Sequence, residues 1–86
     1  MTNQTLVHYP LNTEKAIRIM EKENKLLFKV SLNATKPAIK KTVEQLFNVK
    51  VLKVNTFITM LGEKRAYVQL SKENPAIDVM TKLGLI

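Results

Sequence analysis

The stretch VKVLKVNTFITMLGEKRAYVQL, residues 49–70, contains two alternating apolar runs around one short connection. Successive side chains of a strand point to opposite faces, so each run predicts a β-strand. The connection MLGE, residues 60–63, contains a glycine that suits a tight turn. We therefore expect an antiparallel hairpin at the centre of the fold.

The alternation also predicts the faces of this hairpin. In the first strand, one face carries Leu52, Val54, Thr56 and Ile58, and the other carries Val51, Lys53, Asn55 and Phe57. In the second strand, Ala66, Val68 and Leu70 share the side opposite to Arg65, Tyr67 and Gln69. If the strands pair across the connection, the two polar sets lie together, and we expect them to meet solvent or a partner.

Amphipathic segments precede the hairpin. TEKAIRIMEKEN, residues 13–24, predicts a helix capped by Asn12 or Thr13, and KLLFKVSL, residues 25–32, predicts a strand with Leu32 on its core face. Residues 35–47 predict a second helix with Pro37 in its first turn. The expected core stripe of that helix is Ile39, Val43, Leu46 and Phe47.

A last short helix is expected to begin at Asn74 and Pro75 and to end at Gly84, burying Ile77, Met80 and Leu83. LVHYP, residues 6–10, offers an additional edge strand before Pro10. The order of elements predicts one α+β domain over residues 1–86. Its antiparallel sheet of three to four strands would pack with helices and be followed by the short C-terminal helix.

The net charge of +7 is concentrated in the middle of the chain, since nine bases and only two acids lie between Lys25 and Arg65. Such a region attracts polyanions, usually nucleic acid or an anionic membrane, and the alternative is a solubilising surface. The first ten residues lack the pattern of a signal peptide, and no apolar run approaches the roughly 18 residues that span a bilayer. We expect a cytoplasmic protein that is not embedded in a membrane.

Residues for catalysis or metal binding are scarce. His8 is the only histidine and Asp78 the only aspartate, and cysteine is absent. The carboxylates of the first helix alternate with cations, as on a solvated face, and there is no glycine-rich phosphate loop. We expect no enzyme activity, cofactor, metal or small-molecule substrate.

The cationic residues of the hairpin support RNA binding instead. Lysine and arginine neutralise phosphates, asparagine and threonine bind sugar or backbone oxygens, and aromatic rings stack on unpaired bases. For Phe57 and Tyr67 a second interpretation stays open, in which both rings pack beneath a neighbouring helix.

The run ATKPAIKKTVEQLFNVKVLKVNT, followed by GEKRAYVQL and preceded by HYPLNTEKA, closely resembles the twenty-third family of large-subunit ribosomal proteins, found at the tunnel exit. This resemblance covers nearly the whole chain. It implies a non-enzymatic α+β protein with a four-stranded sheet that binds domain III of the large-subunit ribosomal RNA. It also implies neighbouring ribosomal proteins as partners, and docking of the signal recognition particle and the protein-conducting channel.

The resemblance also implies roles for individual residues. Glu14 and Arg18 would dock factors, although the first-turn position of Glu14 also has a purely structural reading as a helix-dipole partner. The RNA-facing positions that it implies are Thr13, Lys15, Lys36, Lys40, Lys50, Asn55, Thr56, Lys64 and Arg65. The polar face of the hairpin adds Lys53 and Tyr67 as RNA-binding candidates.

The MLGE connection is short, whereas bacterial relatives carry a long basic extension there, so the chain resembles the archaeal form. Two other functions remain open. One is a free-standing module for single-stranded RNA that uses Phe57 and Tyr67 as stacking platforms. The other is a protein-interaction domain whose basic face binds an acidic protein.

Overall fold

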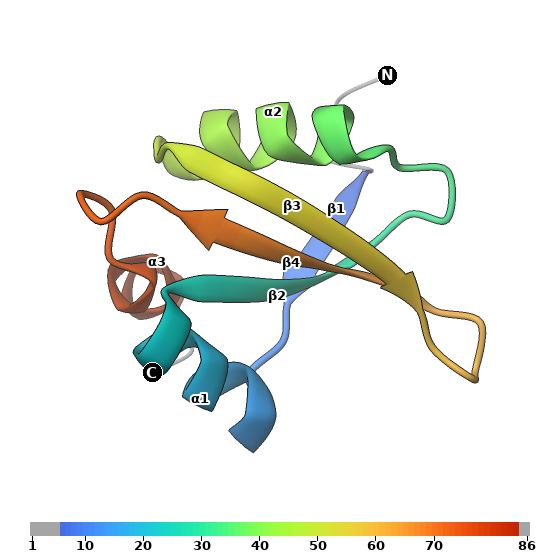
Figure 1. Ribbon diagram of the computed structural model, residues 1–86, viewed down its shortest axis with the longest axis horizontal. Helices are drawn as coiled ribbons and strands as arrows, with labels where there is room; N and C mark the ends of the chain where they lie inside the picture. Colours follow the sequence, from blue (N-terminus) through green and yellow to red (C-terminus); the bar gives the residue numbers. More distant parts are fainter. Residues whose placement is uncertain (1–5, 85–86) are drawn as a thin grey trace.

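The computed structural model describes residues 6–84. The elements follow one another as β1 (Val7–Pro10), α1 (Glu14–Glu23), β2 (Lys25–Val30), α2 (Lys36–Phe47), β3 (Val51–Ile58), β4 (Lys64–Leu70) and α3 (Ala76–Lys82). The strands form one antiparallel sheet in the order β1-β2-β4-β3 (Figure 1). The expected α+β class is confirmed, and the sheet has the fourth strand that the resemblance implied.

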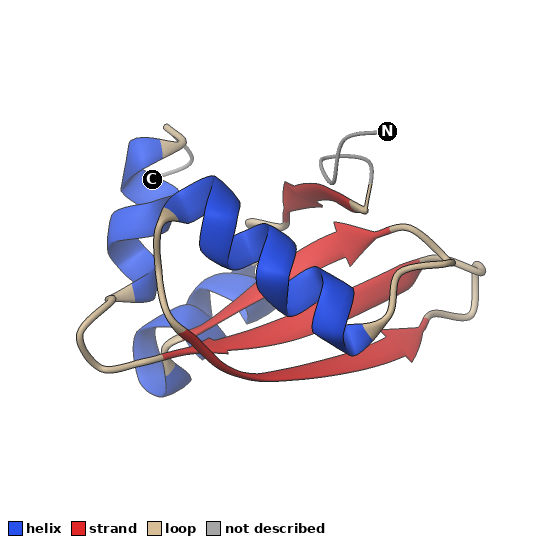
Figure 2. Ribbon diagram, turned by 90° about the horizontal axis from the view of Figure 1, so that it is seen from above, coloured by secondary structure: helices blue, strands red, loops and turns tan. Residues whose placement is uncertain are grey.

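The helices are distributed unevenly over the sheet. Figure 2 shows α2 crossing one face of the sheet, while α1 and α3 lie together at one end. Between α2, α3 and the sheet lies one cluster of buried apolar side chains, which includes Phe28, Ile39, Val68 and Met80. The other face of β3 and β4 has no helix over most of its length, so its side chains are accessible to a partner (Figure 1).

Both long helices begin and end as their sequences predict. The Oγ1 atoms of Thr13 and Thr35 accept hydrogen bonds from backbone N–H groups three residues further on, each at 3.3 Å. Asn24 and Asn48 end α1 and α2 with φ angles of 54° and 53°, a left-handed conformation that asparagine tolerates. Thr13 rather than Asn12 is therefore the cap of α1.

The hairpin closes as expected. The backbone N–H of Thr59 donates to the carbonyl of Glu63 at 2.8 Å, and that of Gly62 donates to the carbonyl of Thr59 at 2.9 Å. Gly62 has a φ of 84°, which a residue with a side chain rarely adopts.

The predicted faces of β3 are wrong at its beginning. Val51 was expected on the polar face but is buried, whereas Leu52 was expected in the core and is 56% exposed. The cause is a β-bulge, because Val51 pairs with Leu70 and Lys53 already pairs with Gln69, so Leu52 is the extra residue. From Lys53 onward the side chains alternate as predicted, although Ile58, at the end of the strand, is 63% exposed.

Some expected core residues are exposed for similar local reasons. Leu32 is exposed because β2 ends at Val30. In α3, Met80 is buried as expected, but Ala76 and Val79 are buried in place of Ile77 and Leu83, because the helix packs with a different stripe toward the core. Leu46 of α2 is also exposed. None of the helices in the described range, residues 6–84, is long and apolar enough to cross a membrane.

Candidate nucleic-acid interface

The face of the sheet turned away from α2 combines cations, amides and two aromatic rings. We call this surface the outer face. The register places Asn55 opposite Tyr67, Phe57 opposite Arg65, and Lys53 opposite Gln69. The next strand adds cations to the same face, because β2 and β4 pair Lys29 with Arg65 and Lys25 with Gln69. We define the outer face by its accessible residues, Lys25, Lys29, Lys53, Asn55, Phe57, Arg65, Tyr67 and Gln69. Leu27, which pairs with Tyr67 on the same side, is buried.

The two aromatic rings of the outer face stack on each other. The ring centroids of Phe57 and Tyr67 are 5.2 Å apart, and the planes differ by 24°. Phe57 keeps 36% of its surface exposed, and Tyr67 is half-buried. The interpretation that both rings pack beneath a helix is therefore wrong for Phe57, which is exposed. Tyr67 lies beside Ile19 and Glu23 of α1 but is only half-buried, so the stacked pair keeps an accessible side.

A carboxylate fixes two cations beside this pair. The Arg65 guanidinium donates to Oε1 of Glu63 from Nη2 at 3.1 Å, and the Lys29 Nζ lies 3.5 Å from Oε2. The hydrogen bond from Arg65 holds the pKa of the Glu63 carboxyl below its ordinary value; the charges of Lys29 and Arg65 add to this effect, and partial burial opposes it. The three side chains keep a net positive charge with little freedom to move.

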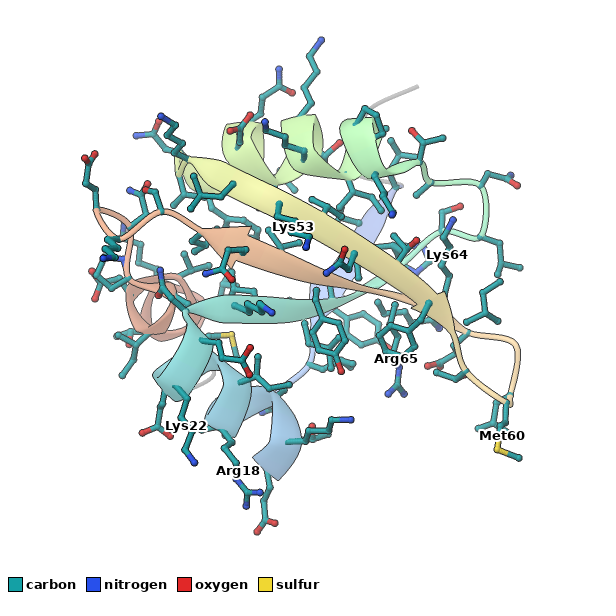
Figure 3. All side chains as sticks on the ribbon, in the orientation of Figure 1. Arg18, Lys22, Lys53, Met60, Lys64 and Arg65 are labelled. Atoms are coloured by element: carbon teal, nitrogen blue, oxygen red, sulfur yellow. The ribbon has the colours of Figure 1, made fainter. Side chains whose placement is uncertain are left out.

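Four of the predicted RNA-facing residues come together on the outer face: Lys53, Asn55, Arg65 and Tyr67. Thr56 and Lys64 do not, because they alternate with these residues and lie on the side of Val54 and Ala66. The Nζ of Lys64 donates to the carbonyl of Ala34 at 2.7 Å and so ties β4 to the loop before α2. Figure 3 shows Lys64 and Arg65 on opposite sides of the strand.

Lys36, Lys40 and Lys50 form a separate group around α2. All three are exposed, and Lys36 and Lys40 lie one helical turn apart. The backbone N–H of Lys50 donates to Oδ1 of Asn74 at 2.8 Å, which positions the turn that leads into β3. Since α2 covers the side of the sheet away from the outer face, these lysines belong to a different surface.

The predicted residues of α1 lie on a helix that packs beside β2, on the other side of the sheet from α2 in Figure 1. Thr13 caps the helix, and Glu14, Lys15 and Arg18 are exposed. Together with Ile17, Glu21 and Lys22, the side chains of Glu14 and Arg18 line a shallow hollow of about 430 Å³. In Figure 3, Arg18 and Lys22 project away from the sheet. This mixed acidic, basic and apolar surface could accept a protein partner.

The sequence prediction of the site omitted Lys25, Lys29 and Glu63. The signal for the two lysines was present, because they alternate with Leu26 and Phe28 on the polar side of β2. Their proximity to Arg65 and Gln69 depends on the pairing of β2 with β4, which local patterns do not define. Across residues 6–84 the structure brings together no group of three or more histidine, cysteine or acidic side chains that could hold a metal ion.

The sequence pattern of the family described as "Ribosomal protein L23" matches residues 5–75. The chain belongs to the ribosomal protein L23 family. This confirms the resemblance found in the sequence, and the match contains every predicted site residue.

Curated relatives extend the match over the whole chain. A "Large ribosomal subunit protein uL23" from Pyrobaculum aerophilum is 57% identical over 74 residues, which cover 86% of this chain and 91% of the relative. Another of that name from Caldivirga maquilingensis is 50% identical over 86 residues, the full length of both. One from Tetrahymena thermophila is 44% identical over the same 86 residues but only 57% of its own length. The chain therefore has the short, archaeal-like form of the L23 family.

Proposed function

We propose that this protein is a structural component of the large ribosomal subunit and binds large-subunit ribosomal RNA through its outer face. It would act in the cytoplasm, bound to the ribosome beside other ribosomal proteins. The curated relatives carry the name of a large-subunit protein, which supports the assembly. The single observation that supports RNA as the ligand is the outer face itself, where cations surround an accessible aromatic pair.

The charge distribution favours a polyanion over an acidic protein as the ligand of this face. The outer face carries four cations, Lys25, Lys29, Lys53 and Arg65. The acidic side chains paired with them are Glu63 and Glu23 at the end of α1. Phosphates repeat along RNA, so evenly spread cations on a sheet can each meet one. The aromatic pair offers a surface on which an unpaired base can stack.

The decisive experiment measures binding of a domain III transcript at several salt concentrations. Each phosphate contact releases counterions, so Lys53→Ala and Arg65→Ala should each lower the slope of log affinity against log salt by about one unit. Lys82→Ala is the matched control, because Lys82 is exposed on α3 and lies away from the outer face. Binding that does not depend on salt, or an equal change in all three variants, would contradict the proposal.

A second role is proposed for the exposed surface of α1. Glu14 and Arg18 line its hollow, and the helix lies at the edge of the basic surface rather than within it. An acidic residue on an otherwise cationic protein can remain free of RNA and pair with a basic partner protein. This surface would contribute to docking of the signal recognition particle and the protein-conducting channel.

A further inference from the structure

A hollow of about 210 Å³ lies between α1 and the sheet, lined by Ile19, Glu23, Lys25 and Tyr67. Its Tyr67 wall is the ring that stacks on Phe57. Tyr67 therefore belongs to the outer face and also lines the hollow beside it.

The walls of this hollow are held in place by contacts on both sides. The side-chain amide of Gln69 donates from Nε2 to the backbone carbonyl of Glu23 at 2.7 Å, which ties the end of α1 to β4. The Lys25 Nζ lies 3.1 Å from Oε1 of Glu23. Phe57 supports Tyr67 from β3. A ligand would therefore enter a space that exists before binding, at a smaller cost in side-chain entropy.

The chemistry of the lining favours a nucleobase over a phosphate as the ligand of the hollow. Ile19 and Tyr67 offer apolar surface, and the ring of Tyr67 can stack on a flat heterocycle. The carboxylate of Glu23 would repel a phosphate inside the hollow but can accept hydrogen bonds from base N–H groups. Lys25, whose side chain is 26% exposed, can approach a phosphate next to the base.

We propose that the hollow is a subsite for one unpaired RNA base, which stacks on Tyr67 while Phe57 supports the ring. The inference rests on the proposed RNA-binding role of the outer face and adds a nucleobase contact to its phosphate contacts. It also gives the two aromatic side chains different roles, since Tyr67 contacts the base and Phe57 positions Tyr67.

The first test compares Tyr67→Leu with Tyr67→Phe on a domain III transcript. Loss of the ring should weaken binding by about tenfold, since a stacked base contributes this order of affinity, while Tyr67→Phe should retain it. The salt slope should stay as in the unchanged protein in both variants, because no charge is removed. Ile77→Ala is the control, because Ile77 is an exposed apolar residue of α3 and is absent from the hollow.

The second test does not depend on how well Tyr67→Leu folds. The chain contains no tryptophan, so Tyr67→Trp introduces a single indole into the hollow. Stacking of a base on this ring should quench its fluorescence as the transcript is added. Unchanged emission during saturable binding would overturn the base subsite and leave RNA binding by the outer face intact.

Two further outcomes distinguish failure of the proposed function from failure of the base subsite. If the unchanged protein fails to bind the transcript at low salt, the proposed function itself fails, and the subsite fails with it. If the indole emission responds to purified large-subunit proteins but not to the transcript, the hollow takes a protein side chain and the base proposal is wrong.

Discussion

At the scale of single residues, Asn24 joins three parts of the fold. Its side-chain Nδ2 donates to the carbonyls of Leu70, Ser71 and Asn74 at 3.0–3.3 Å, and its Oδ1 accepts from the Ala76 N–H at 2.6 Å. One side chain thus links the end of α1, the end of β4 and the start of α3. The sequence predicts a helix end near Asn24, but these bonds span about fifty positions and no local pattern indicates them.

Asn24→Gly should lower the free energy of unfolding by about 2–4 kcal/mol, because several part-buried backbone groups lose their partner. Glycine keeps the left-handed backbone available, so the loss reports the side chain. Asn48→Gly is the control, since Asn48 has nearly the same φ and ends α2 in the same way. Urea denaturation measures both variants, and equal losses would show that the Asn24 network contributes little.

The ion cluster of Lys29, Glu63 and Arg65 should make the stability of the fold depend on pH. The pKa of the Glu63 carboxyl lies below its ordinary value of 4.5, so the cluster stabilises the fold fully above that pH. The stabilisation is lost as the pH falls through the lowered pKa. An NMR titration should therefore place the Glu63 midpoint below 4.5, and Arg65→Gln should move it upward. A midpoint at or above the ordinary value in the unchanged protein would refute the cluster.

At the scale of elements, sequence patterns located the helices and strands well but assigned some of their faces incorrectly. The alternation of β3 failed only at Val51 and Leu52, because a bulge inserts one residue without leaving a glycine or proline as a signal. In α3 the apolar residues fit two stripes, and contacts with α1 and the sheet select Ala76, Val79 and Met80. Tertiary packing therefore decided what local periodicity could not.

The bulge in β3 reverses the expected sensitivity of its first two residues. Val51→Ala should destabilise the protein by about 2 kcal/mol, because Val51 is only 2% exposed and its loss leaves a gap in the core. Leu52→Ser should change stability by no more than about 0.5 kcal/mol, because the side chain is already in solvent. Thermal and urea unfolding compare the two. If β3 alternated regularly from Val51, Leu52→Ser would destabilise the protein more than Val51→Ala.

At the scale of the whole molecule, the charge of the chain divides the surface. Residues 25–65 carry the whole net charge of +7, and they supply β2, α2, β3 and the start of β4. The sequence alone therefore predicted a basic region, and its preference for nucleic acid as the ligand stays a prediction. It did not predict that α2 and the outer face present their lysines on different sides, because that depends on how the helix packs on the sheet.

Separate surfaces should have separable functions. Glu14→Gln should weaken binding of the signal recognition particle to ribosomes severalfold, since it removes one charge from the exposed hollow of α1. The same substitution should leave the salt slope for the domain III transcript unchanged. Glu73→Gln is the control, because Glu73 is an exposed acid of the turn before α3. Particle binding that is equally affected by both variants would argue against a specific role for α1.

The hairpin turn has a consequence for how the family can vary. The backbone hydrogen bond between Thr59 and Glu63 joins the ends of β3 and β4. Met60 and Leu61 lie beyond this bond and are almost fully exposed to solvent. Doubling the length of such a loop costs only about 0.6 kcal/mol in closure entropy. The connection can therefore change in length while the sheet register stays the same. A short and a long form of the family can share one fold and one outer face, and differ only in how far this single projection extends.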